Sequence, residues 1–399
     1  METLAETIKK EIEEIMPEVV ENRRYIHAHP EVGYDTKGTE ELVRNSLKEY
    51  GIEILPSNTG VIGMVRGLDH SRYIAFRADM DALCLQEENE VPYKSLYPNR
   101  MHACGHDGHT AMLIGAAKLM QRHAAELPCD VMLVFQPAEE GPGVGGALLM
   151  TEDIETLGLE ARPAAMVAIH VINLMPTGTI AVRYGAQMAS TDDFDVKIIG
   201  LGGHAALPDL AVDSISVAAK FVTLMEAFMS RRINPLSSAV CSFGTFNGGS
   251  ARNIIAESTD ISGTVRCLRE EDRSLILEGM DRILKGICDG YNAKYKLSTH
   301  RGLPVLVNDE ATTAWAEKII RNMIGDDATM VLPQGAMGAD DFAYYGKIMP
   351  STYIIIGSAD YKRGLTVANH NPKFDFDEKA MYIGIELWCR LALGSASYE

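Results

Sequence analysis

The sequence lacks the features of a membrane-spanning or secreted protein. It has no run of about 20 apolar residues, the length that crosses a bilayer. Its first residues, METLAETIKKEIEEIM, are acidic and amphipathic, without the cationic start and apolar run of a secretory signal. The seven cysteines are an odd number without short regular spacing, which argues against a disulfide framework and favours a reducing compartment. We therefore expect a cytoplasmic protein.

The chain also has fewer positively charged than negatively charged residues. The chain has 37 lysines and arginines against 55 aspartates and glutamates, a net charge of −18. Such a surface repels phosphate backbones and anionic membranes, so neither nucleic acid nor a membrane is an expected partner. No low-complexity tract is present, and 46% of the residues are hydrophobic, as in a folded protein. Because 399 residues exceed what one compact core holds, we expect two domains.

The first half and the end of the chain alternate between helical and strand patterns. Apolar residues recur at helical spacing in four segments, residues 4–15, 39–50, 110–123 and 376–391. Short apolar runs rich in branched side chains indicate four buried strands, residues 73–76, 131–135, 166–169 and 353–356. This alternation predicts an α/β fold with a mostly parallel sheet, in which ligands bind at the carboxyl ends of the strands.

The middle of the chain has a different order of elements. Its pattern predicts strand, helix, two strands, helix and strand, which is the βαββαβ order of a ferredoxin-like α+β unit. We therefore predict a catalytic domain made of residues 1–187 and 301–399, interrupted by an inserted domain of residues 188–300.

Side chains that bind metals follow the predicted strands. The segment HACGHDGH, residues 102–109, combines histidines, a cysteine and an aspartate with two glycines. Acidic pairs and a histidine come directly after three of the strands: Asp79 and Asp81, Glu139 and Glu140, and His170. The segment AsnHisAsnPro near the end of the chain adds His370. These side chains are expected to converge on one edge of the sheet.

The mixture of donors restricts the metal. Thiolate, imidazole and carboxylate together suit zinc or another borderline divalent ion, whereas calcium and magnesium prefer oxygen. Five ligands are enough for two ions if one ligand bridges: Cys104, His106, Glu140, His170 and His370. Of the two adjacent glutamates, one could then bind metal while the other accepts a proton from water.

Each residue taken alone also has a simpler interpretation. A single histidine such as His170 or His370 is more often a hydrogen-bonded residue than a ligand. Glu139 and Glu140 alone would be a solvated acidic pair, and Cys104 alone a small buried apolar residue. Cys104 beside histidines could also be a thiol nucleophile. The metal interpretation depends on the combination.

Taken in order, the motifs resemble those of the metal-dependent amidohydrolases and peptidases of the aminoacylase and carboxypeptidase superfamily. The branch is that of hippurate hydrolase, N-acyl-amino-acid amidohydrolases and the plant indole-acetyl-amino-acid hydrolases. The resemblance covers nearly the whole chain, from HisAlaHisProGlu at 27–31 onwards. The motifs that carry it are MHACGHDGHT (101–110), FQPAEEG (135–141), GGHAA (202–206), MGADDF (337–342) and HNPKFDFDE (370–378).

The resemblance implies a dinuclear metallopeptidase site with two divalent ions per subunit, zinc or manganese, with cobalt or nickel as alternatives. It makes Cys104 the bridging ligand and adds four others, His106, Glu140, His170 and His370. It assigns Glu139 as the general base and then the acid. Relatives outside this branch have a ligating His-x-Asp motif where this chain has Asp79 and Asp81, and we expect His106 to replace that histidine. Asp81 then either orients an imidazole or is a structural aspartate.

The resemblance also implies that the inserted domain is a lid and dimerisation module. His204 and Asn253 are its implied catalytic residues, which stabilise the oxyanion in their own or the partner subunit, although GlyGlyHis and GlyGlySer are also ordinary loop sequences. The expected reaction is hydrolysis of N-acyl amino acids, with acetyl, benzoyl or similar acyl groups, to a carboxylate and a free amino acid. The alternatives are a dipeptidase or carboxypeptidase, a deacetylase of an N-acetylated intermediate, a metal-free cysteine hydrolase and a non-catalytic binding protein.

Overall fold

The computed structural model describes residues 4–141 and 145–398, and residue contacts divide the chain into two compact units. The larger unit comprises Met1–Gly185, Val307–Gln334 and Asp341–Glu399, and the smaller comprises Ala186–Leu306 and Gly335–Asp340. Two short strands, β7 (Gly185–Met188) and β14 (Leu306–Asn308), lie at the sequence boundaries between the units. Each unit has its own hydrophobic core.

The larger unit is built on an eight-stranded sheet with the order β1-β2-β4-β3-β5-β16-β6-β15. Its central strands β4, β3, β5 and β16 run parallel to one another, and the antiparallel pairs lie towards its edges. This confirms the predicted α/β fold with a mostly parallel sheet. The strands are β1 (Glu53–Leu55), β2 (Val61–Val65), β3 (Arg72–Asp79), β4 (Asp130–Gln136), β5 (Arg162–Pro176), β6 (Ile180–Val182), β15 (Thr329–Val331) and β16 (Ser351–Ala359).

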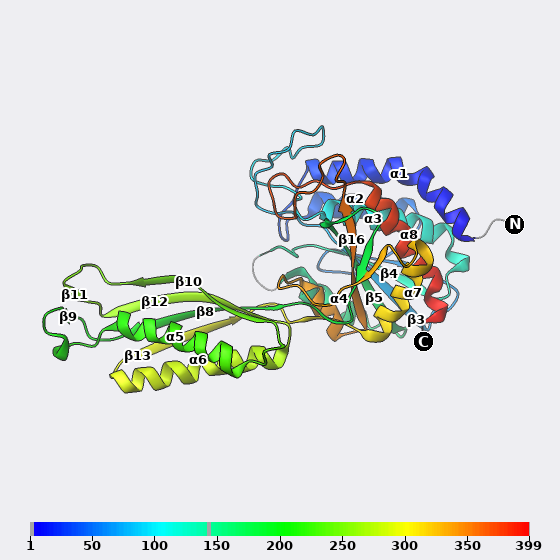
Figure 1. Ribbon diagram of the computed structural model, residues 1–399. Coiled ribbons are helices and arrows are strands. Elements are labelled where there is room, and N and C mark those ends of the chain that lie inside the picture. The colour runs from blue at the N-terminus through cyan, green and yellow to red at the C-terminus, as the bar shows by residue number, and fades with distance from the viewer. Residues whose placement is uncertain (1–3, 142–144, 399) are drawn as a thin grey trace. The chain divides into compact units, whose positions relative to one another are not determined.

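Helices of the larger unit bury apolar faces against this sheet and against one another. α1 places Ile8, Ile12, Ile15 and Val19 on one buried face, and it packs with α3 and α8 (Figure 1). Among the helices in residues 4–141 and 145–398, none combines the length and the hydropathy needed to cross a bilayer. The helices are α1 (Leu4–Ala28), α2 (Lys37–Glu49), α3 (His106–Arg122), α4 (Gly145–Thr156), α7 (Glu310–Ile324) and α8 (Lys379–Leu393).

The smaller unit has the predicted ferredoxin-like order. Its four-stranded antiparallel sheet has the order β10-β12-β8-β13, and Figure 1 shows α5 and α6 side by side along one face of this sheet. Alternate residues of β8 (Phe194, Val196 and Ile198) are buried in the core of the unit, as expected for a sheet covered on one face. The elements are β8 (Ser190–Ile199), α5 (Ser214–Arg232), β10 (Ala239–Gly248), β12 (Ser258–Cys267), α6 (Glu270–Tyr291) and β13 (Lys294–Arg301).

Candidate metal centre

The segment HACGHDGH is divided between a short loop and the first turn of α3. The predicted helical start at Thr110 is wrong, because α3 begins at His106. Gly105 precedes it with φ +93°, a left-handed conformation that favours glycine, and a Cβ there would lie 2.5 Å from Val171 Cγ2. Cys104 and His106 therefore stand on either side of a turn that no larger residue fits.

Two other candidate ligands, His170 and His370, lie on different kinds of segment. His170 does not follow its strand but lies inside β5, which continues to Pro176 because Val171 and Ile172 pair with β16. His370 lies before α8 in a left-handed conformation with φ +66°. Glu139 and Glu140 follow β4, as expected, after a turn in which Ala138 has φ +56°.

Cys104 lies at the centre of the cluster. Its Sγ is 3.3 Å from His170 Nε2 and 3.2 Å from His370 Nε2. His370 Nε2 also lies 2.8 Å from Glu140 Oε1. The sulfur of Cys104 therefore lies close to two imidazoles, those of His170 and His370, that are far apart in the chain.

His106 presents one ring nitrogen to this cluster. Its Nδ1 lies 2.8 Å from the main-chain oxygen of Asp81. Because a carbonyl oxygen only accepts, Nδ1 carries a proton, and the neutral ring then has its lone pair at Nε2. Among the described residues, the buried Nε2 has no hydrogen-bond partner, although Glu139 Oε2 lies 3.9 Å away. When this nitrogen is unprotonated, its buried lone pair faces carboxylates and fits a metal ion.

All five predicted ligands and Glu139 belong to overlapping groups of side chains whose donor atoms lie within 4.8 Å of one another. Three groups together contain all six residues: Cys104 with His106 and His170, Cys104 with Glu140 and His370, and His106 with Glu139 and Glu140. A further group combines His106 with Asp79 and His109. The mixture of sulfur, nitrogen and oxygen donors suits a borderline transition metal.

The charges in the cluster also favour a cation. Burial lowers the pKa of His106, but the carboxylates of Asp79, Asp81 and Glu140 outweigh it and raise that pKa to about 10. Burial, reinforced by Glu140 and Glu139, raises the pKa of the Cys104 thiol well above its usual value. Without a cation, Cys104 is therefore a protonated thiol, which argues against it as an activated nucleophile.

Asp81 supports the two glutamates and also faces a histidine ring. Its carboxylate accepts the backbone N–H groups of Glu139 at 2.9 Å and Glu140 at 3.0 Å. Its main-chain oxygen accepts from His106 Nδ1 at 2.8 Å, and its Oδ1 lies 3.5 Å from the same nitrogen. Asp81 thus fixes the turn that carries both acids.

The sequence pattern does not reveal a buried ionic group behind the cluster. Arg77 donates to Asp79, to Asp341 Oδ1 at 2.9 Å and to Gln136 Oε1 at 2.9 Å. It thereby links the ends of β3 and β4 to the 3-10 segment η3 (Asp341–Lys347). Asp341 lies in the MGADDF motif, but nothing in the local pattern indicates that it pairs with an arginine 264 residues away.

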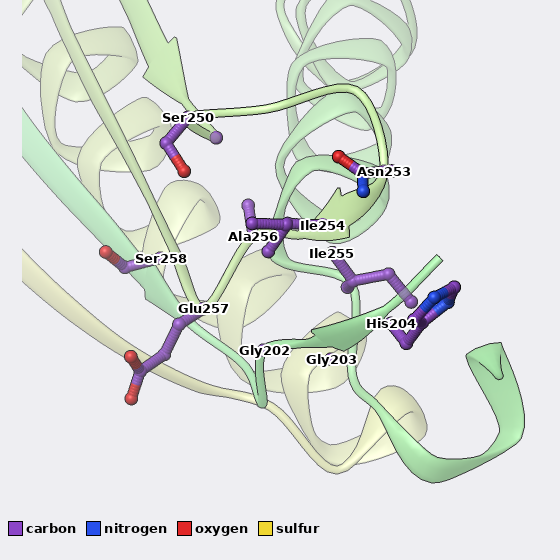
Figure 2. Close-up of a pocket in the computed structure, with 11 residues that line it drawn as sticks. Gly202, Gly203, His204, Ser250, Asn253, Ile254, Ile255, Ala256, Glu257 and Ser258 are labelled. Carbon is purple, nitrogen blue, oxygen red and sulfur yellow. The ribbon is translucent and has the colours of Figure 1, made fainter. Parts of the chain in front are cut away.

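The remaining predicted site residues, His204 and Asn253, lie together in the smaller unit. His204 ends β9 (Gly203–His204), which pairs with β11 (Ile254–Ile255), and Ala205 N donates to Asn253 O at 3.1 Å. Both residues line a cavity of about 560 Å³, which Figure 2 shows with the ribbon that carries them. Ala206 N donates to His204 Nδ1 at 3.1 Å, so the neutral ring carries its proton at Nε2 and can donate it.

The chain is similar to known proteins over nearly its whole length. Residues 75–394 match the model of peptidase family M20/M25/M40. It is 34% identical to thermostable carboxypeptidase 2 of Saccharolobus solfataricus over 98% of both chains. It is also 34% identical to the N-acetylcysteine deacetylase of Bacillus subtilis, over 94% of this chain and 96% of that one. The structure of Bacillus subtilis YXEP, a dinuclear metal binding peptidase, matches with a TM-score of 0.83, 30% identity and coverage of 97% and 100%.

Proposed function

Because the chain belongs to peptidase family M20/M25/M40 and is a hydrolase of amide bonds, we propose that its substrates are N-acyl amino acids. The products are a carboxylate and a free amino acid. The observation that carries this proposal is the convergence of sulfur, nitrogen and oxygen donors around Cys104, with Glu139 beside them. The likeness to an N-acetylcysteine deacetylase supports an acyl amino acid as substrate.

We assign the cluster to two divalent ions, with Cys104 as the shared ligand. The other proposed ligands are His106, Glu140, His170 and His370. Zinc is the favoured ion because a thiolate is present, and manganese, cobalt and nickel are alternatives. When bound, such ions polarise the amide carbonyl and make water a stronger nucleophile.

Glu139 is the proposed proton carrier. It accepts a proton from the attacking water, whose oxygen bonds to the carbonyl carbon of the amide. As the C–N bond breaks, Glu139 gives that proton to the departing amine. Its main chain is held by Asp81, and its Oε2 lies 3.9 Å from His106 Nε2, so the carboxylate belongs to the cluster yet is distinct from the proposed ligands.

His204 and Asn253 are the proposed donors to the oxyanion, in their own or the partner subunit. An Nε2–H on His204 is suitable because Ala206 already occupies Nδ1. We expect His204→Ala to lower kcat by about 10²–10³-fold, the usual effect of removing one such donor. His300→Ala, an exposed histidine of β13, should leave kcat unchanged as the matched control. A His204→Ala enzyme with kcat within threefold of wild type would remove His204 from the mechanism.

The smaller unit is the proposed lid and dimerisation domain. β10 and β13 are the outer strands of its sheet. β10 reads AVCSFGTFNG, without charge or proline, and exposes Val240 and Phe246, whereas β13 carries exposed Lys294 and Lys296. Charged side chains protect a sheet edge from pairing, so β10 is the edge through which we propose a homodimer or higher homo-oligomer. No nucleic acid or membrane partner is proposed. We propose a cytoplasmic location, which the seven free thiols of the chain support.

The test is hydrolysis of a panel of N-acetyl, N-benzoyl and indole-acetyl amino acids alongside dipeptides. We expect release of free amino acid from the acyl amino acids, loss of activity after chelation and recovery when Zn, Mn, Co or Ni is restored. Faster cleavage of dipeptides would favour the second candidate, a dipeptidase or carboxypeptidase, which the likeness to a carboxypeptidase supports. Activity that persists in protein shown to be free of metal would instead identify Cys104 as the nucleophile. Binding without turnover would identify a non-catalytic protein.

A further inference from the structure

The main chain of Val171, the residue after His170, is held by side chains at both its N–H and its carbonyl. Val171 N donates to His109 Nε2 at 3.0 Å. Val171 O accepts from His170 Nδ1 at 2.8 Å and from Asn369 Nδ2 at 3.2 Å. The main chain of Val171 therefore has contacts with α3 through its N–H and, through its carbonyl, with His170 in β5 and with the segment that carries His370.

The contacts of His109 determine its tautomer. A backbone N–H only donates, so His109 Nε2 must carry a lone pair. On the other side of the ring, Nδ1 lies 2.6 Å from Asp79 Oδ1 and donates its proton there. His109 and Asp79 are both buried, and Asp79 is itself held by Arg77. A doubly protonated ring would set Nε2–H against the Val171 N–H, so the neutral Nδ1–H form is the one that fits.

The orientation of the Val171 carbonyl in turn determines the tautomer of His170. Because this carbonyl accepts from Nδ1, the proton of His170 lies there and the lone pair is at Nε2. That Nε2 is the atom 3.3 Å from Cys104 Sγ. A change in the main-chain conformation at Val171 would move this carbonyl and so disturb both the direction and the tautomer of His170.

We propose that His109 is a positioning residue: it holds the N–H of Val171, fixes the main chain at Val171 and thereby keeps His170 in its metal-binding form. The inference rests on the proposed function, because it takes His170 as a metal ligand. Hydrogen bonds then connect Arg77 to Asp79, Asp79 to His109, and His109 to the main chain of Val171. Through these bonds the buried end of β3 supports the position of His170, although no hydrogen bond is described between His109 and His170. Such supports of a ligating histidine commonly change metal affinity by about 10–100-fold.

Two substitutions separate the two hydrogen bonds of His109. Asparagine places an amide near the position of Nδ1, so His109→Asn can still donate to Asp79 but does not reach Val171. Glutamine places its carbonyl near the position of Nε2, so His109→Gln can accept from Val171 while losing the bond to Asp79. If His109 acts through its hydrogen bond to the N–H of Val171, His109→Asn should bind metal at least tenfold more weakly than wild type. His109→Gln should stay within about threefold of wild type.

Metal affinity is measured on the full-length protein by competition with a chelator, and the visible spectrum of the cobalt-loaded protein reports the geometry of the ligands. His123→Asn is the matched control, because His123 also contacts a carboxylate, Glu11 at 2.6 Å, but follows the far end of α3. Its affinity and cobalt spectrum should match wild type. Thermal unfolding of each metal-free variant shows whether it is folded.

Equal affinities of His109→Asn and wild type, with identical cobalt spectra, would overturn the inference. So would equal losses in His109→Asn and His109→Gln, since they would indicate a general packing role. If His109→Asn does not fold, the metal affinity of His109→Gln tests the inference. An affinity near that of wild type supports the inference, and a tenfold loss of affinity overturns it. Failure of wild type to bind any metal would overturn the proposed function itself, which separates the two failures.

Discussion

Replacing Glu139 by glutamine is expected to lower kcat by about 10²–10⁴-fold, the usual contribution of a general acid or base. Glutamine preserves the size of the side chain and the backbone N–H that Asp81 accepts, but it removes the group that receives the proton. We expect the metal content of the protein to stay at the wild-type value, because Glu139 is not a proposed ligand. The measurements are kcat on the best acyl amino acid and metal analysis of the same sample.

Two variants make this result specific. Glu152→Gln, at an exposed position of α4, should keep native kcat and metal content. Glu140→Gln should lose activity together with bound metal, because it removes a proposed ligand. A Glu139→Gln enzyme with a near-native rate would show that another group carries the proton.

Replacing Arg23 by leucine is expected to lower the free energy of unfolding by about 3–5 kcal/mol. The fully buried guanidinium of Arg23 lies 2.7 Å from Asp107 Oδ2 and 2.7 Å from Asp375 Oδ1. Burial raises the pKa of Asp107, but Arg23 and His27 outweigh it and hold that pKa far below its usual value. Without Arg23, two carboxylates remain buried with much less compensating charge. Because Asp107 follows His106 in the first turn of α3, metal affinity should fall as well.

Arg24 provides the control for this substitution. It is the next residue in α1, but its side chain is 45% exposed and pairs with Glu378 at 2.7 Å. Exposed ion pairs of this kind contribute less than about 1 kcal/mol, so Arg24→Leu should change stability little. Urea unfolding followed by circular dichroism measures both variants. If Arg23→Leu were no less stable than Arg24→Leu, the buried ionic group would not be a major source of stability.

The fold could be predicted from the sequence where the pattern is strictly local. β3 and β4 contain the apolar runs 73–76 and 131–135, which predict buried strands, and both strands are buried along almost their full length. The start of α3 could not be located in this way, because its first turn is polar yet buried. β5 extends beyond the apolar run because β16 pairs with it through His170 and beyond. α7 is not predicted at all, although Asp309 caps it and accepts from Thr312 N.

The candidate ligands could be found because metal binding requires unusual side chains in unusual combinations. The positions of His204 and Asn253 on one short ribbon agree with their proposed common role, but the sequence alone does not indicate that β9 and β11 pair. The residues that hold the candidate ligands in place could not be predicted from the sequence, for a physical reason. Arg77 and His109 act through contacts with distant residues or with the main chain, and neither kind of contact leaves a local pattern.

If copies of the chain pair through β10, as proposed, the unequal edges of the four-stranded sheet also limit how many copies one sheet can join. A sheet with two uncharged edges can add strands at both sides without end, as in a fibre. Here β10 is uncharged, whereas β13 presents Lys294, Lys296 and Arg301. If β10 paired with β10 of a second copy about a two-fold axis, neither chain would have an uncharged edge left. The joined sheet would then have the positively charged strand β13 at each end. Growth of the sheet would then terminate after a single addition.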